Sequence, residues 1–351
     1  MDTNYTYKNW FRGVKIRYIT FLDYDRKTLL SKMIYFFLVL LSYIYGIIVF
    51  LRNKGYDYGI FPIYSSSRTI ISIGNISWGG SGKTSLVSYL HKNLSSCLRV
   101  ATITKGYAKD EFLLLKERLT DVFDAKKRLP LIKSLESKFD LFILDDGFQY
   151  RRLKRDLDIV VMGPKECSKN HHLLPAYILR EPLCSIKRAQ IAVINYSHLI
   201  DDLDLFKKKL LYINPRLRIY TSRYVYRRFL DRNKKEVGED YFRDKRIAVL
   251  TAVGYPQGFI DILSRLPLNV TEKLIYPDHY EFEKEELMIV EDRLRASNIK
   301  DIIITYKDFY HLDLSNACLN YFILDVDLKI DNEEDFLSEV KKNIGVPDIS
   351  L

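Results

Sequence analysis

Residues 70–90 read IISIGNISWGGSGKTSLVSYL, and this stretch decides the fold. An apolar run suited to a buried strand leads into a glycine-rich loop, and Lys83 and Thr84 then open a helical pattern. A strand, a glycine loop and a helix in this order make a phosphate cradle, because glycines let backbone N–H groups approach a ligand and the helix N-terminus attracts negative charge. The stretch therefore predicts a nucleotide-binding loop.

The side chains of this loop have separate expected roles. We expect Lys83 to contact the β- and γ-phosphates and the Thr84 hydroxyl to hold Mg²⁺. Ser77 stands where the strict G-x-x-x-x-G-K-[ST] pattern has its first glycine, so a structural turn with an incidental lysine is the alternative interpretation. The residues expected to bind the nucleotide are Asn75, Ser77, Trp78, Gly79, Gly80, Ser81, Gly82, Lys83, Thr84 and Ser85.

The composition limits the class of protein. The chain has 351 residues, of which 47% are hydrophobic and 28% charged, so we expect a folded protein with room for two domains. A formal net charge of +10 favours an acidic partner. Because no basic and aromatic stripe resembles a nucleic-acid-binding module, an anionic membrane or a phosphorylated substrate is favoured over nucleic acid. The four cysteines lack metal-ligand spacing and are typical of reduced cytosolic thiols.

A long uncharged segment lies near the N-terminus, at residues 33–51, with the sequence MIYFFLVLLSYIYGIIVFL. As a helix it is about 28 Å long, which matches the hydrocarbon thickness of a bilayer. The segment predicts membrane contact, and a buried core helix is the alternative. Basic residues flank it on both sides, so spanning would put many positive charges outside, and we favour a helix embedded in the cytoplasmic leaflet. The flanking charges are Lys8, Arg12, Lys15, Arg17, Arg26, Lys27 and Lys32 before the segment and Arg52 and Lys54 after it.

Apolar runs and amphipathic runs alternate after residue 64, which predicts βαβ crossovers and a largely parallel sheet. The expected architecture is α/β: a P-loop NTPase-like sheet, a second, smaller α/β lobe and an N-terminal membrane-associated helix. The expected boundaries are 1–64 for the helical segment, 65–230 for the P-loop domain, 231–245 for a polar linker or short hairpin, and 246–351 for the second lobe. The expected strands are 70–74, 99–103, 139–145, 157–162, 190–194, 217–221, 246–252, 301–305 and 321–325; the expected helices are 84–95, 129–138, 257–265 and 284–296.

Two carboxylates end a buried strand in FDLFILDDGFQ, residues 139–149. The carboxyl end of a parallel strand faces the phosphate loop, so we expect Asp145 and Asp146 to reach Mg²⁺. The alternative is a polar strand end with a turn at Gly147. In LPAYILREPL, residues 174–183, Arg180 is expected to clamp phosphate and Glu181 to reach the metal, with a surface ion pair as the alternative.

Asp110 and His279 are ambiguous when each is considered alone. Asp110 precedes a helical run and is typical of a helix N-cap, and His279 in YPDHY has the context of a loop histidine. Their significance depends on the longer segments that contain them.

Those segments, taken in order, resemble the tetraacyldisaccharide 4′-kinases, the lipid A 4′-kinases of Gram-negative bacteria. The resemblance covers nearly the whole chain and is most specific at DDGFQYRRLKRDLDIVVM, residues 145–162. The other similar segments are LSYIYGIIVFLRNKGYDYG (41–59), GNISWGGSGKT (74–84), TKGYAKDEFLLL (104–115), LLPAYILREPL (173–183), TAVGYPQGF (251–259), PDHYEF (277–282) and TYKDFYHL (305–312).

The resemblance implies transfer of the ATP γ-phosphate to the 4′-hydroxyl of a tetraacyldisaccharide 1-phosphate, which forms lipid IVA. It implies a catalytic dyad of Asp110 and His279, assisted by Lys83, and a phosphate contact from Arg180. The implied Mg²⁺ ligands are Thr84, Asp145, Asp146 and Glu181. It also implies a glycolipid substrate and contact with membrane lipids at the cytoplasmic face of a Gram-negative inner membrane; a monomer is favoured.

Two other functional classes remain as alternatives. A membrane-associated P-loop GTPase or ATPase of other function would need, for guanine, an N-K-x-D motif after a strand. The nearest string, NKKE at residues 233–236, lies in the polar linker and ends in glutamate, which argues against guanine. A membrane-anchored scaffold would leave the phosphate loop and the paired aspartates without a role.

Overall fold

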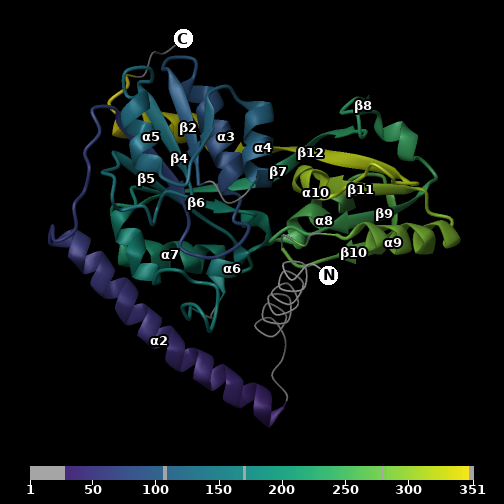
Figure 1. Cartoon of the computed structure of the whole chain (residues 1–351), viewed down its shortest axis with the longest axis horizontal. Helices are drawn as coiled ribbons and strands as arrows, with labels where there is room; N and C mark the ends of the chain where they lie inside the picture. The colour runs from purple at the N-terminus through teal and green to yellow at the C-terminus, as the bar shows by residue number, and fades with distance from the viewer. Residues whose placement is uncertain (1–27, 106–108, 169–170, 279, 281, 348–351) are drawn as a thin grey trace, which may run out of the picture.

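The computed structural model describes residues 28–105, 109–168, 171–278, 280 and 282–347. Within these ranges one 12-stranded sheet runs through the molecule in the order β10-β9-β11-β12-β7-β6-β5-β1-β4-β2-β3, with β8 paired to β7 (Figure 1). Neighbouring strands are parallel except for the β12–β7 and β7–β8 pairs. The predicted α/β class with a largely parallel sheet is confirmed.

The first lobe contains β1 to β6 and the helices between them. Its strands are β1 (Thr69–Gly74), β2 (Val100–Thr104), β3 (Val122–Asp124), β4 (Leu141–Asp145), β5 (Leu157–Met162) and β6 (Ile191–Asn195). Its helices are α3 (Lys83–Leu94), α4 (Lys109–Arg118), α5 (Arg128–Leu135), α6 (Pro164–Cys167) and α7 (Leu203–Ile213), with 3-10 turns at Leu183–Arg188 and Ser197–Leu199. The strands expected from the sequence are present, and β3, a three-residue edge strand, was not expected.

The second lobe contains β9 to β11 with helices α8 to α10, and two long strands join it to the first. The joining strands are β7 (Arg218–Leu230) and β12 (Asn320–Ile330). The remaining elements are β8 (Glu236–Val237), a 3-10 turn at Glu239–Phe242, β9 (Arg246–Thr251), α8 (Pro256–Ser264), β10 (Asn269–Ile275), α9 (Lys284–Ala296), β11 (Asp301–Thr305), α10 (Tyr306–His311) and α11 (Glu333–Asn343). The polar segment 231–245 thus contains a hairpin strand and a helical turn.

Alternate residues along the central strands face opposite helical layers. In β5, Ile159 and Val161 pack in one apolar cluster with α3, whereas Val160 and Met162 pack in another with α7. This alternation explains the continuous apolar runs of the central strands, because both faces of the sheet are covered. In the second lobe, α8 and α9 cover opposite faces in the same way.

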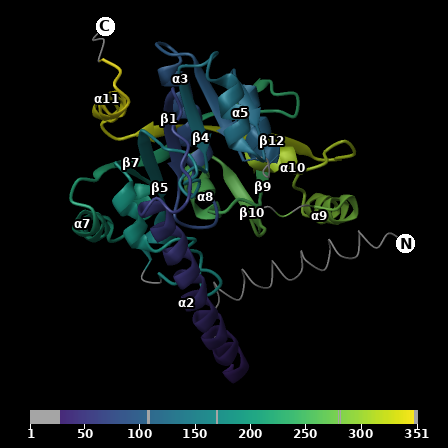
Figure 2. The same cartoon turned by 60° about the vertical axis from the view of Figure 1, so that its left-hand side comes forward.

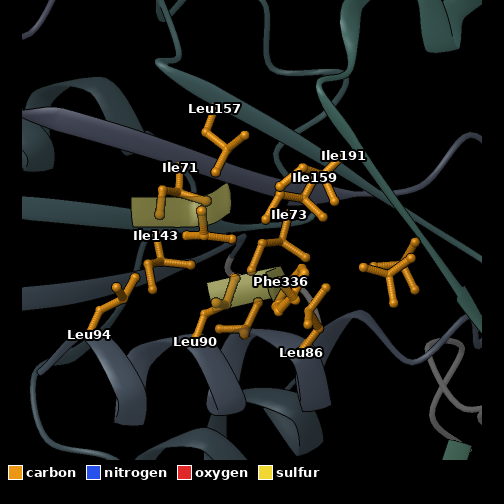
Figure 3. Packing of buried hydrophobic residues seen from close by; sticks show 14 of the residues in the cluster. Ile71, Ile73, Leu86, Leu90, Leu94, Ile143, Leu157, Ile159, Ile191 and Phe336 are labelled. Atoms are coloured by element: carbon orange, nitrogen blue, oxygen red, sulfur yellow. The ribbon is translucent and has the colours of Figure 1, made fainter. Parts of the chain in front are cut away.

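The last helix returns to the first lobe. Although α11 lies in the range 246–351, its Phe336 is fully buried in the cluster that also contains Ile73, Leu86 and Leu90 (Figure 3). The Phe336 ring meets that of Tyr220 with centroids 5.1 Å apart. The core around β1 and α3, which flank the phosphate loop, is therefore completed by α11 near the C-terminal end of the described chain.

Helix α2 (Leu29–Asp57) projects away from the sheet (Figures 1 and 2). Its most apolar window has a mean hydropathy of 2.5, and only 11% of that window is buried. Large side chains such as Phe36 and Ile48 are exposed. The buried core helix considered from the sequence is therefore wrong, and the helix is long and apolar enough to cross a membrane.

A buried ionic cluster fastens the two joining strands to α4. Asp325 on β12 is almost fully buried, and its carboxylate is 2.6 Å from Arg118 on α4 and 3.2 Å from Arg228 on β7. Removing the carboxylate leaves the partly buried guanidinium of Arg118 without this counter-ion, whereas Arg228 keeps its ion pair with Glu236 at 3.3 Å.

We therefore expect Asp325→Ala to lower the free energy of unfolding by about 2 kcal/mol, between the cost of breaking a fully buried ion pair and that of an exposed one. The matched control is Asp327→Ala, two residues along the same strand, where the side chain is 53% exposed and 3.6 Å from Arg227. Solvent screens that pair, and the control should change stability by less than about 0.5 kcal/mol. Urea unfolding measures both, and equal losses would contradict the assignment.

Candidate active site

The glycine loop connects β1 to α3 as the sequence predicted. Gly79 and Gly82 adopt positive φ angles of 113° and 85°, which favour glycine. A Cβ atom on Gly82 would lie 2.2 Å from the side-chain nitrogen of Asn195 and 2.6 Å from the hydroxyl of Tyr224. The loop thus approaches β6 and β7 too closely for any other residue, and α3 begins at Lys83 with its N-terminus at the loop.

Ser77 has a structural partner that explains its presence. Its hydroxyl donates a short hydrogen bond to the carboxylate of Glu166 on α6, and both side chains are buried. The other Glu166 oxygen accepts the backbone N–H of Gly163 at 2.8 Å. Asn75 donates to the hydroxyls of Ser77 (3.2 Å) and Ser81 (3.1 Å). Hydrogen bonds between the buried polar side chains therefore stabilise the conformation of the loop.

Asp146 is surrounded by cations at the carboxyl end of β4. Its carboxylate receives two hydrogen bonds from the Arg180 guanidinium, at 2.7 and 3.0 Å, and lies 3.5 Å from Lys105 Nζ and 3.9 Å from Lys83 Nζ. Burial opposes ionisation, yet the Arg180 hydrogen bonds and these charges keep the pKa of Asp146 far below its usual range. The predicted Lys83, Asp146 and Arg180 are thus brought together.

Asp145 has the opposite electrostatic character. Its side chain is fully buried, and its Oδ1 has no hydrogen-bond partner among the described residues. Burial first, and then the negative charge of Glu111, raise the pKa of Asp145 to about 7. Arg128 donates to the backbone carbonyl oxygens of Asp145 and Asp146, which fixes the strand end where Asp146 has a positive φ of 53°.

Glu181 is not brought to the two aspartates as expected. Its carboxylate accepts hydrogen bonds from Arg188 at 2.8 Å and from Asn53 of α2 at 3.1 Å. Across the described part of the chain, no three histidine, cysteine or acidic side chains gather at metal-binding distance. Asp145, Asp146 and Glu181 are therefore not gathered as one metal-binding group among the described residues. Arg188 and Asn53 contact only Oε2 of Glu181, and its Oε1 is buried without a hydrogen-bond partner in the described chain.

Asp110 lies in the first turn of α4 and is buried, so it is part of the helix and not its N-cap. Its Oδ2 is 3.1 Å from Nε2 of His311 and 3.8 Å from Nζ of Lys307, both on α10. His279 lies outside the described residues. Its neighbour Asp278 is described, and its carboxylate is 3.3 Å from the same Lys307 Nζ.

Four residues of this region were not singled out from the sequence as site residues. They are Glu111, Arg128, Lys307 and His311. Burial raises the pKa of Glu111, against the charges of Lys307 and Lys83. Lys307 and His311 occur in TYKDFYHL, where the lysine and histidine are four residues apart on a short helix. This four-residue spacing was the signal for a shared site that the sequence offered. Only the tertiary structure reveals that the two side chains face Asp110.

Comparisons with known proteins identify the family of this chain. A sequence profile of the tetraacyldisaccharide-1-P 4′-kinase family matches residues 34–110 and 108–345. The tetraacyldisaccharide 4′-kinase of Aquifex aeolicus is 30% identical over 84% of this chain and 94% of that protein. The corresponding enzyme of Halothermothrix orenii is 28% identical over 90% and 94%.

A relative and a solved structure extend the comparison. A probable mitochondrial tetraacyldisaccharide 4′-kinase of Arabidopsis thaliana is 28% identical over 78% of this chain and 80% of its own length. A crystal structure of LpxK from Aquifex aeolicus in complex with ATP matches with a TM-score of 0.67 and 27% identity, covering 89% of this chain and 99% of that one. The family profile spans most of the chain, and the chain belongs to the tetraacyldisaccharide-1-P 4′-kinase family.

Proposed function

We propose that this protein transfers the γ-phosphate of ATP to the 4′-hydroxyl of a tetraacyldisaccharide 1-phosphate and so forms lipid IVA. The main support for the proposal is that Lys83, Arg180 and Lys105 surround Asp146 beside the glycine loop, in a chain of this family. Phosphoryl transfer needs mainly positioned cations around the transferring group, and this cluster supplies them. The ATP complex of the Aquifex aeolicus relative supports ATP as the donor.

The residues at the end of β4 fit a divalent cation. Asp145 offers a buried oxygen without a hydrogen-bond partner in the described chain, next to the loop that carries Thr84. Carboxylate and hydroxyl oxygens are the ligands that Mg²⁺ prefers. We infer that Thr84 and Asp145 hold Mg²⁺ together with Asp146 and Glu181, whose Oε1 is also buried without a hydrogen-bond partner in the described chain. The ion would neutralise charge on the β- and γ-phosphates.

Asp110 is proposed to accept the proton of the attacking sugar hydroxyl, with His279 orienting it. A buried carboxylate in the first turn of α4 suits this role, because the next residue, Glu111, interacts electrostatically with Lys83 and Asp146 of the cation cluster. Lys307 contacts both Asp110 and Asp278. Asp278, the residue before position 279, is thus linked to Asp110 through Lys307, which supports this arrangement. General-base assistance of this kind contributes about 10²- to 10⁴-fold to a rate.

The acyl chains of the substrate are proposed to enter along α2 at the cytoplasmic leaflet of the inner membrane. A groove of about 310 Å³ lies between α2 and the segment after residue 170. It is lined by Ser42, Tyr43, Gly46, Ile47, Phe50, His171, His172 and Leu173. The Tyr45 hydroxyl on α2 donates to the backbone oxygen of Arg180 at 3.0 Å, so a lipid held here would lie near the phosphate-binding arginine.

The direct test of the function is incubation with γ-labelled ATP and the disaccharide 1-phosphate in detergent. Mass spectrometry of the product should find one added phosphate, located on the distal sugar by fragmentation. ATP hydrolysis without phosphorylated disaccharide would contradict the proposal and favour a P-loop ATPase of other function.

We expect Asp110→Asn to lower kcat by about 10²-fold or more, because the amide cannot accept the proton, while the KM for ATP stays within threefold. Lys83→Ala should instead raise the KM for ATP and lower kcat together. The matched control is Asp313→Asn, an exposed aspartate near the end of α10, which should leave both constants unchanged. A pure KM effect of Asp110→Asn would make Asp110 a binding residue.

The metal assignment predicts a pH-dependent effect on stability. The pKa of Asp145, about 7, lies above that of an unfolded aspartate, so this carboxyl weakens folding increasingly as the pH rises toward and through that value. Without metal, Asp145→Asn should therefore raise Tm relative to wild type, and by more at pH 8 than at pH 5.5. Adding Mg²⁺ at pH 8 should raise the Tm of wild type and not of the variant. Equal Mg²⁺ shifts would remove Asp145 from the metal site.

A further inference from the structure

Helix α10 presents two basic side chains to the carboxylate of Asp110. Lys307 and His311 are four residues apart and share one face of the helix. Both contact the same oxygen, Oδ2, at 3.8 Å and 3.1 Å. The first lobe thus contributes the carboxylate, and the second lobe contributes the two groups that contact it.

Helix α10 is itself held firmly. It has only six residues, and a capping box at its start joins the Thr305 hydroxyl and the carboxylate of Asp308. The Asp308 carboxylate, which is buried, also accepts the backbone N–H of Ala252 at 2.8 Å. Since Asp308 is adjacent to Lys307, the cap fixes the backbone from which Lys307 extends.

The adjacent face of α10, with Tyr306 and Tyr310, contacts the far end of α4. Tyr310 donates a short hydrogen bond to Glu117, and the Arg118 guanidinium lies 4.8 Å from the centre of the Tyr306 ring. Asp110 and Glu117 are two turns apart on α4. The two helices therefore meet at both of these points, which limits how far Lys307 can move relative to Asp110.

Lys307 is placed among three carboxylates from both lobes. Its Nζ lies 3.8 Å from Asp110 and 4.0 Å from Glu111 on α4, and 3.3 Å from Asp278 in the segment after β10. Burial disfavours a charged lysine, but these three carboxylates raise the pKa of Lys307, and it stays a cation. A half-buried cation shared by three carboxylates restrains their relative positions more than a single exposed ion pair does.

We propose that Lys307, aided by His311, is a positioning residue that holds Asp110 in the orientation needed to accept the proton of the sugar hydroxyl. The proposal rests on the proposed function, in which Asp110 is the proton acceptor. The lysine contributes through Asp110 and does not touch the reacting atoms. A displacement of about 1 Å in such a group can lower the rate about 10²-fold. The second lobe thereby controls whether Asp110, in the first lobe, is correctly placed to accept the proton.

The first test compares Lys307→Met with the matched control Lys300→Met, which removes a charge from an exposed position in the same lobe. Lys307→Met should lower kcat about 10²-fold with the KM for ATP within threefold, and the control should match wild type. Retention of kcat within threefold by Lys307→Met would overturn the proposal. Phosphorylation of the disaccharide by wild type is measured first, and its absence would instead refute the proposed function.

A double-mutant cycle separates positioning from a general structural role. If Lys307 acts through Asp110, the variant that combines Asp110→Asn with Lys307→Met should be no slower than Asp110→Asn alone. If the double variant instead lost kcat by the product of the two single effects, the two residues would act independently, and the proposal would be overturned. If Lys307→Met does not fold by circular dichroism, Lys307→Arg replaces it in the cycle. That variant keeps the cation at a displaced point and should lower kcat about tenfold, with the same non-additivity.

Discussion

The structure depends on how charge is buried at the carboxyl end of β4. A carboxylate removed from water is unstable unless cations or hydrogen bonds replace the lost solvent. Asp146 meets this constraint with Arg180, Lys83 and Lys105, and the consequence is a dense positive cluster next to the glycine loop. Asp145, one residue earlier, is left with an unsatisfied oxygen. Adjacent residues thus have opposite electrostatic states: the pKa of Asp146 is lowered by its cations, and burial raises the pKa of Asp145.

The same constraint links distant parts of the chain. Arg180 belongs to a loop that α2 holds through the Tyr45 hydroxyl, and Lys307 belongs to a helix of the second lobe. Because the sheet is continuous through β7 and β12, the two lobes share one backbone framework, and the buried Asp325 pairs with arginines from α4 and β7 within it. The site is therefore built from three regions that are remote in sequence but joined by buried polar contacts.

Sequence patterns predicted the local features well. The strand, loop and helix around Lys83 and the paired aspartates at a strand end follow from short-range periodicity and turn chemistry, and they are present as expected. The long helix was recognised by its lack of charge, although it extends further at both ends than residues 33–51. Strand β10 was not expected, since its alternating exposed and half-buried residues give a weak signal beside the uniformly apolar central strands.

Side-chain contacts between residues far apart in the chain could not be predicted from the sequence. Nothing local reveals that Ser77 contacts Glu166, 89 residues away, or that Arg188 occupies Glu181. Lys307 and His311 have an ordinary helical spacing, and their importance comes only from the approach of α10 to α4. Whether His279 joins Asp110 stays a prediction, because that residue lies outside the described ranges.

The position of α11 has a consequence for biosynthesis. Phe336 and Val340 belong to the apolar cluster that contains residues of β1 and α3, yet α11 is synthesised long after those two elements. The strands of the first lobe can form during translation, but this cluster stays incomplete until α11 has been made. Completion of the core around α3 therefore awaits the synthesis of α11, and a nascent chain halted before that helix would expose apolar side chains to chaperones and proteases.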